Sequence, residues 1–317
     1  MNKKIFFSTD VHGATSIWRK WLKVPEIYGV DALMLCGDLT GKVLVPLIKQ
    51  QNGTIKTSYF GQNFTLTNEA EVIEMEKRIE DSGAYSIRCS KDELETFQLE
   101  PQVVEKIIME KICNRMEIWL ESLLKKIDPM QVQVVVMPGN DDDVEIDSII
   151  KSFVSEGIIW CLDEVIEIVG VETISLAHTN HTPWDTPREA TEKELKRKIN
   201  GLTEKLKNPG ESIFNFHCPP YNTRLDLAPK LSKKMKPVSG PNGIEYIHVG
   251  SKAVRTSIEK NQPILSLHGH IHESSGIEKI GKTVVINPGS EYGEGILRGY
   301  IIEFSNKALV NYYKVEG

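Results

Sequence analysis

Residues 4–12 read KIFFSTDVH, a short apolar run that ends abruptly in Asp10 and His12. A continuous apolar run of this length is typical of a strand buried on both faces of a sheet. The pattern recurs four times, at 32–36 before Asp38, 132–137 before Asn140, 213–216 before His217 and 264–267 before His268 and His270. These runs predict an α/β fold. In open α/β sheets ligands bind beyond the carboxyl ends of the strands, so we expect the polar residues to meet there.

Strands also end in Asp or Asn because these residues form turns. A single polar residue after a strand would therefore indicate little about function. Five strand ends that draw only on Asp, Asn and His favour a functional site over five unrelated turns.

The composition is that of an ordinary globular protein, with 317 residues, 40% hydrophobic and 26% charged. The net charge of −6 argues against a protein that coats nucleic acid or an anionic membrane, although a nuclease could take its positive field from metals. Five cysteines without CxxC spacing predict no disulfide framework and no zinc knuckle. The N-terminal apolar run is too short for a signal peptide and no stretch resembles a membrane helix, so we expect a cytoplasmic protein.

About a hundred residues separate Asp38 from Asn140, whereas a strand–helix–strand step needs roughly 30. We therefore predict a single domain over residues 1–317, with an insertion at about 42–100 made of a hairpin and a helix. The hairpin turn is expected at Asn52-Gly53, between strand-like runs 43–49 and 54–66. Other predicted elements are helices at 17–29, 68–81, 102–127 and 187–207, and strands at 164–169, 172–177, 276–280, 283–287, 299–304 and 308–314.

The strand ends supply seven candidate metal ligands: Asp10, His12, Asp38, Asn140, His217, His270 and His272. One divalent ion rarely needs seven ligands, but two ions that share a bridging carboxylate do. Mixed imidazole and carboxylate ligands suit Mn, Fe, Zn, Co or Ni more than Ca or Mg. Two ions about 3.5–4 Å apart form the usual clamp for in-line attack on phosphorus.

In chain order the motifs Asp10-x-His12, Gly37-Asp38, Gly139-Asn140, His217 and Gly269-His270-x-His272 resemble those of the calcineurin-like metallophosphoesterases. The resemblance covers about 1–40 and 130–317. It implies a four-layer αββα sandwich of two mixed sheets. It also implies that Asp38 bridges two divalent metal ions together with a hydroxide that attacks phosphorus. The first ion would be held by Asp10, His12 and His272, and the second by Asn140, His217 and His270.

The sequence departs from the family pattern after Asn140, where Asp141 stands in place of a histidine that usually assists the leaving group or contacts the phosphate. Asp141 could act as a general acid only with a raised pKa, and its other interpretation is turn geometry or support of the ligands. His181, in the loop segment 179–184 (TNHTPW), is the second candidate for the catalytic acid. Its other interpretation is an exposed loop histidine.

The resemblance implies a metal-dependent phosphoesterase that hydrolyses a phosphodiester or phosphomonoester, with a small phosphorylated substrate and no membrane partner. Two alternatives remain. A non-catalytic adaptor on the same fold would be expected to lose ligands. A nuclease would carry a basic stripe, whereas this chain has only the short run 230–236 (KLSKKMK), interpreted as a solvated helix end, so nucleic acid is disfavoured. The insertion would form either a cap over the site or the interface of a homo-oligomer.

Overall fold

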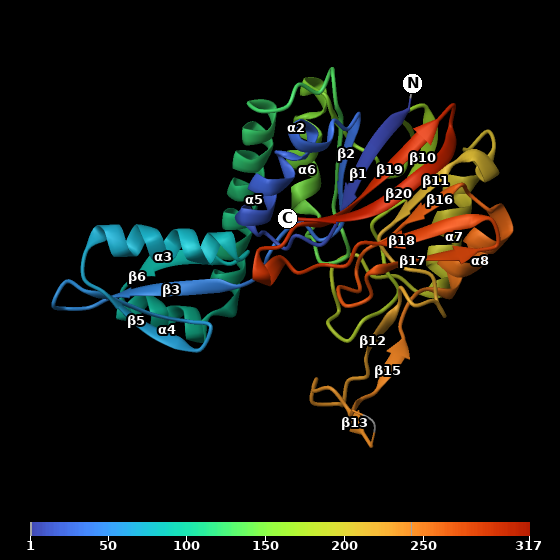
Figure 1. Ribbon diagram of the computed structural model, residues 1–317. Helices are drawn as coiled ribbons and strands as arrows, with labels where there is room; N and C mark the ends of the chain where they lie inside the picture. The colour runs from blue at the N-terminus through green and yellow to red at the C-terminus, as the bar shows by residue number, and fades with distance from the viewer. Residues whose placement is uncertain (1, 242) are drawn as a thin grey trace.

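The computed structural model describes residues 2–241 and 243–317 and consists of two six-stranded sheets packed face to face (Figure 1). The first sheet has the order β20 (Ala308–Glu316), β19 (Arg298–Ser305), β1 (Lys3–Ser8), β2 (Ala32–Cys36), β7 (Gln133–Met137) and β8 (Ile158–Ile159). The second has the order β17 (Gly276–Ile280), β18 (Thr283–Asn287), β16 (Leu265–Leu267), β11 (Ile213–Phe216), β10 (Val171–Leu176) and β9 (Val165–Ile168). Both sheets are mixed, with parallel strands at their centres and antiparallel strands β19, β20, β17 and β9 outside them.

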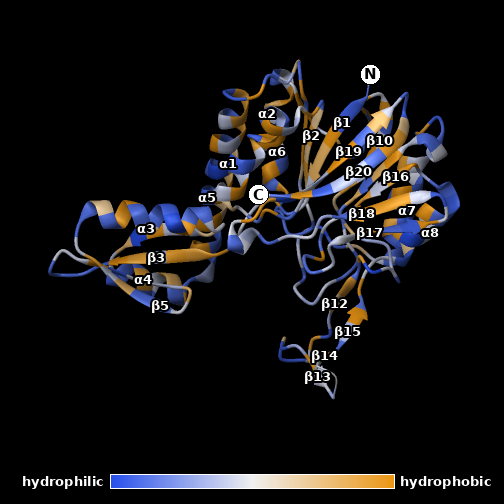
Figure 2. Cartoon of the chain, viewed as in Figure 1, coloured by the Kyte–Doolittle hydropathy of each residue, from blue (hydrophilic) through white to orange (hydrophobic). Residues whose placement is uncertain are grey.

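Three hydrophobic cores separate four layers, because successive side chains of a strand point to opposite faces. In β1, Ile5 and Phe7 pack between the sheets, whereas Phe6 packs under the helices of the first sheet. In β11, Phe214 and Phe216 pack under the helices of the second sheet. The strands of both sheets are mostly hydrophobic, whereas the helices mix both characters (Figure 2). The αββα sandwich implied by the motifs is confirmed.

Helices α1 (Thr15–Trp21), α2 (Val24–Tyr28), α5 (Pro101–Leu124) and α6 (Glu145–Ser152) cover the first sheet, and α7 (Glu192–Thr203) and α8 (Lys252–Asn261) cover the second. The single helix predicted at 17–29 is wrong, since Pro25 lies in the first turn of a separate helix α2. The helix predicted at 187–207 begins only at Glu192. Thr191 caps it and forms a capping box with Glu194, which leaves residues 187–190 in a loop.

The insertion holds more structure than the predicted hairpin and helix. Its sheet has the order β5 (Gln62–Leu66), β4 (Ile55–Tyr59), β3 (Leu44–Lys49) and β6 (Tyr85–Cys89), and it carries α3 (Glu69–Asp81) and α4 (Lys91–Leu99). The β3–β4 hairpin across Asn52-Gly53 is confirmed. The continuous strand expected over 54–66 is wrong, because Phe60 and Gly61 have φ of 46° and 71° and form a second tight turn. The insertion has its own core, centred on Leu47 and Ile79, and projects from one side of the sandwich (Figure 1).

A second projection was not foreseen. Residues 227–248 contain the two-stranded pairs β12 (Leu227–Pro229) with β15 (Tyr246–His248) and β13 (Ser239–Gly240) with β14 (Gly243–Ile244). These pairs form an arm that extends below the sandwich in Figure 1. The basic run 230–236 lies in this arm, so its interpretation as a helix end is wrong.

All five cysteines are free, which agrees with the expectation of no disulfide framework. Throughout residues 2–241 and 243–317, the helices lack the combination of length and apolar character that a membrane crossing requires.

Helix α5 is fastened to α1 by a stack of tryptophans. The ring centroids of Trp18 and Trp119 lie 4.7 Å apart, and Trp119 is 2% exposed. We predict that Trp119→Ala lowers the free energy of unfolding by about 3–5 kcal/mol, because it leaves a large cavity in a packed core. Ile118→Ala, one residue earlier in the helix at 52% exposure, should change it by less than about 0.5 kcal/mol. Denaturant titration of both variants checks this, and equal losses would contradict it.

Candidate metal centre

The seven predicted ligands follow strands of both sheets and meet at the carboxyl ends of those strands. Asp10 and His12 follow β1, Asp38 follows β2 and Asn140 follows β7, all in the first sheet. His217 follows β11, and His270 and His272 follow β16, in the second sheet. Within each sheet a main-chain hydrogen bond joins the loops that carry the candidate ligands. It runs from Asp10 N to Gly37 O (2.9 Å) in the first sheet and from Gly269 N to His217 O (3.0 Å) in the second. The site therefore lies where the two sheets adjoin.

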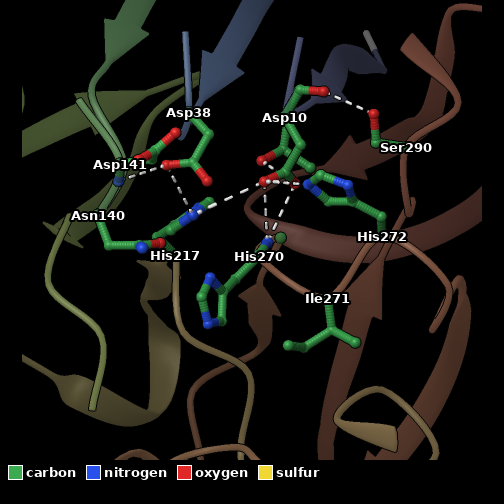
Figure 3. A network of polar contacts seen from close by, with 12 residues as sticks. Asp10, Asp38, Asn140, Asp141, His217, His270, Ile271, His272 and Ser290 are labelled. Atoms are coloured by element: carbon green, nitrogen blue, oxygen red, sulfur yellow. Dashed lines mark hydrogen bonds and ion pairs between the residues drawn. The ribbon is translucent and has the colours of Figure 1, made fainter. Parts of the chain in front are cut away.

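Six of the seven side chains form two groups with metal-ligand spacing. Asp10, His12, Asp38 and His272 make one group, and Asp38, His217 and His270 make the other, with the ligand atoms of each group within 4.8 Å of one another. Nε2 of His217 lies 3.3 Å from Oδ1 of Asp38, and Nε2 of His12 lies 3.7 Å from Oδ2 of the same carboxylate. Each group can hold a divalent ion, and Asp38 faces both (Figure 3). The grouping coincides with the ligand sets that the motif resemblance implies.

Asn140, the seventh predicted ligand, lies beside Asp38 and His217 in Figure 3. Its side chain is buried, and its Oδ1 atom has no hydrogen-bond partner in the described structure. A buried carbonyl oxygen without a partner costs roughly 1–3 kcal/mol, so such an atom calls for an explanation. A metal ion beside His217 would provide that missing partner.

Three glycines, each directly before a candidate ligand, allow a close approach between ligands because they have no side chain. A Cβ on Gly37 would lie 2.0 Å from Nδ1 of His217, and one on Gly139 would lie 2.1 Å from Oδ1 of Asp38. A Cβ on Gly269 would lie 2.5 Å from Oδ2 of Asp10. Any side chain at these positions would displace one of the candidate ligands, which explains why glycine precedes Asp38, Asn140 and His270.

Four ligands have left-handed backbone conformations that are uncommon outside glycine. The φ angles are 54° at Asp10, 42° at His12, 44° at Asp38 and 68° at His270. Each such residue costs on the order of 1–3 kcal/mol and persists only where the surroundings hold it. Here the two sheets hold the loops, and the strained backbone turns the side chains inward from the strand ends.

The electrostatics suit cations bound among the ligands. Burial alone would raise the pKa of Asp38, but His217 and His12 outweigh it and lower the pKa. Burial lowers the pKa of His12 and of His270 to about 4, so both imidazoles are neutral near pH 7. The Nε2 atoms of His12 and His272 lie 3.0 Å apart. For His217 and His272 burial alone would lower the pKa, but Asp38 and Asp10 outweigh it, raising the pKa of His217 to about 9 and also raising that of His272. A bound cation would displace the protons of these two imidazoles, because an imidazole ligates a metal in its neutral form.

Asp141 lies at the rim of the site. Its backbone N–H donates to Oδ1 of Asp38 (3.0 Å), and its carboxylate lies 3.8 Å from both Nδ1 of His12 and Nζ of Lys42. Burial and the nearby charge of Asp38 raise the pKa of Asp141 to about 7. A raised pKa is the condition that the sequence argument named for a general acid, and Asp141 in that role stays a prediction. Lys42 was missed by that argument, although it lies in the same loop as Asp38, between β2 and β3.

His181 is not brought to the ligands. Its side chain is 63% exposed, and its Nδ1 lies 3.3 Å from Oε2 of Glu189. In the described part of the chain no hydrogen bond joins its imidazole to a predicted metal ligand. The arrangement fits the exposed-loop interpretation better than a catalytic acid.

Two neighbours of the site were not identified from the sequence. Asp142 is fully buried and accepts hydrogen bonds from Leu39 N, Gly139 N, and Thr40 N and Oγ1, so it joins the loops that carry Asp38 and Asn140. The ring of Tyr292 lies 4.7 Å from that of His12. Asp142 could have been suspected from its place in the run Asp141–Asp143, whereas nothing in the sequence around Tyr292 indicates a place beside the ligands.

The sandwich and the ligand cluster define a protein with the calcineurin-like metallophosphoesterase fold. No protein-family model matches the chain. It belongs to the same family as the uncharacterized protein MJ1162 of Methanocaldococcus jannaschii, with which it is 38% identical over 173 residues, 53% of this chain and 68% of that protein.

Solved structures share the fold at low identity. One is 17% identical with a TM-score of 0.56 and covers 100% of this chain and 99% of its own. The protein TT1561 of Thermus thermophilus is 14% identical with a TM-score of 0.51 over 94% of both chains. The structure of an archaeal phosphodiesterase covers 99% of both chains at 12% identity, and its TM-score of 0.40 is too low to support an argument. The first two likenesses establish the fold and nothing about the reaction.

The glycine contacts lead to a test of the ligand geometry. We predict that Gly37→Ala abolishes metal binding in the group that contains His217, because the added Cβ would displace that imidazole. Gly29 is the matched control, since its φ of 60° is also left-handed but nothing lies within 4 Å of a Cβ there. Gly29→Ala should keep the wild-type metal content. Elemental analysis of desalted proteins compares the two, and equal metal content would contradict the prediction.

Proposed function

We propose that this protein is a metal-dependent phosphoesterase that hydrolyses a phosphodiester or a phosphomonoester. The observation that carries the proposal is that two groups of metal-ligating side chains share one carboxylate, that of Asp38. Two divalent ions bound there would lower the pKa of a bound water and neutralise phosphoryl oxygens. The donor set is mixed imidazole, carboxylate and amide, which favours Mn, Fe, Zn, Co or Ni.

The residues of the chain have distinct tasks in this proposal. Asp10, His12 and His272 would hold one ion, and Asn140, His217 and His270 would hold the other. Asp38 would serve both ions, because its Oδ1 atom faces His217 of one group and its Oδ2 atom faces His12 of the other. Asp141 lies at the rim beside His12 and Lys42, where a departing alkoxide or phenoxide would need a proton. We assign Asp141 that task.

The substrate we propose is a small phosphorylated molecule. The chain carries a net charge of −6, which disfavours long polyanions such as nucleic acid. All seven ligands are present, which disfavours the adaptor alternative. We propose that the insertion either limits access to the site or forms a homo-oligomer interface. The molecular mass in solution of a variant that lacks the β4–β5 turn of the insertion, compared with that of the wild type, tests the second role, since loss of an interface would lower the mass.

Asp38→Asn tests the bridging role. We expect hydrolysis of bis-p-nitrophenyl phosphate by the Mn²⁺-loaded protein to be lost and metal content to fall, because a neutral amide cannot bridge two dications. Asp31→Asn is the matched control, since Asp31 precedes the same strand β2 that Asp38 follows and pairs with Lys3 far from the ligands. Full activity with two ions in Asp38→Asn would refute the proposal.

Leaving-group dependence tests the acid. We expect Asp141→Asn to slow hydrolysis of a phenyl phosphate ester more than that of a p-nitrophenyl phosphate ester, because the p-nitrophenolate leaving group needs little protonation. General acids contribute about 10²–10⁴-fold, which sets the scale for the poor leaving group. His181→Ala should affect both esters equally. The reverse pattern would return the task to His181.

A further inference from the structure

The amide of Asn140 must present its oxygen, not its nitrogen, to a metal ion. An amide oxygen has lone pairs for a metal, whereas the NH₂ group is a pair of donors and binds no cation. The two ends of the amide are almost equal in size, so shape alone does not choose between them. Something beside Asn140 must therefore determine which end faces His217.

The neighbour of the nitrogen end is a hydroxyl. Nδ2 of Asn140 donates to Oγ1 of Thr186 at 2.7 Å, while Oδ1 has no partner among the described residues. A hydroxyl can donate one hydrogen bond and can accept others. If the hydroxyl of Thr186 were free to donate to Asn140, the amide could equally turn its oxygen toward Thr186 and away from the metal ligands.

Glu189 prevents the Thr186 hydroxyl from donating a hydrogen bond to Asn140. Its Oε1 accepts from Oγ1 of Thr186 (2.8 Å), from N of Thr186 (2.9 Å) and from Oγ1 of Thr182. Its side chain is 4% exposed. Burial alone would raise the pKa of Glu189, but the hydrogen bonds from Thr182 and Thr186 outweigh it and lower the pKa to about 2. An ionised carboxylate has no proton to give, so the hydroxyl proton of Thr186 lies on the side of Glu189.

The same loop is fixed to the main chain of Asn140. N of Arg188 donates to O of Asn140 at 3.1 Å, and the guanidinium of Arg188 donates to O of Asp142 and pairs with Asp147. Arg188 is buried, with 5% of its surface exposed. Thr186 and Glu189 therefore keep a constant position relative to the Asn140 side chain.

We propose that Thr186 and Glu189 are positioning residues that orient the amide of Asn140, so that its oxygen faces the second metal ion. The single proton of the Thr186 hydroxyl is committed to Glu189, so Thr186 can only accept from Asn140, and the amide has one allowed orientation. This inference rests on the proposed function, because it assumes that Asn140 ligates a metal.

The test measures metal affinity rather than turnover. Metal-free wild type, Thr186→Val and Thr182→Val are each titrated with Mn²⁺ by calorimetry, and the ion content of the desalted proteins is measured. Thr186→Val removes the hydroxyl with little change in shape, and we expect the affinity for the second ion to fall by about 10–100-fold, the usual cost of losing a partner that orients a ligand. Affinity for the first ion should not change.

Thr182→Val is the matched control. It also removes a hydroxyl that donates to Oε1 of Glu189, but the hydrogen bonds of Thr182 do not reach Asn140. It should bind both ions with wild-type affinity. Thr186→Ser, which keeps the hydroxyl, should do the same, and Thr186→Ala provides the same loss in a smaller side chain if the valine variant does not fold.

The outcomes distinguish this inference from the proposed function. Two ions of wild-type affinity in Thr186→Val or Thr186→Ala would overturn the orienting role and leave the metal centre in place. An equal loss in Thr182→Val would overturn it too, because disturbance of the loop would then explain both. A wild-type protein that binds no second ion would overturn the proposed function and this inference together.

Discussion

The buried carboxylate of Asp38 is the constraint on which the site depends. It is 3% exposed, and a charge with so little solvent around it must be compensated by neighbouring groups. Compensation comes from His217 in the other sheet, whose pKa is raised to about 9, and from the N–H of Asp141, which follows β7 in the same sheet as Asp38. Since these groups come from both halves of the sandwich, Asp38 can be accommodated only where the two sheets adjoin at their carboxyl ends.

The strands and hydrogen bonds around the site stabilise the strained loops that carry the candidate ligands. Four ligands adopt left-handed φ angles, and three glycines leave no room for a side chain. Such loops are unstable alone and require rigid supports on either side. Parallel pairing of β1, β2 and β7 provides one support, and Asp142 provides another by accepting four hydrogen bonds from the loops after β2 and β7.

The sequence indicated the candidate ligands because Asp, Asn or His follows each of five buried strands, a recurrence that unrelated turns do not explain. The four layers were implied by the motif resemblance, whereas the apolar runs by themselves indicated only strands that are covered on both faces. The second turn of the insertion was missed because Phe60-Gly61 interrupts an otherwise strand-like run, and φ above zero at phenylalanine is uncommon. Thr186 and Glu189 were missed because they lie far beyond Asn140 in the chain, Thr186 just before and Glu189 within the segment 187–207 that was interpreted as helix. The capping box Thr191–Glu194 was the signal that would have placed them in a loop.

The insertion is joined to the first ligand group more closely than its position in the chain suggests. Arg115 of α5 is buried and donates to O of Gly13, directly after His12, and to O of Ala84, at the entry to β6. A Cβ on the neighbouring Gly83 would lie 2.2 Å from O of His12. The backbone of His12, which has a left-handed φ, is therefore packed against the end of the insertion on one side. The contact of the insertion with the candidate ligand group is therefore made through the backbone.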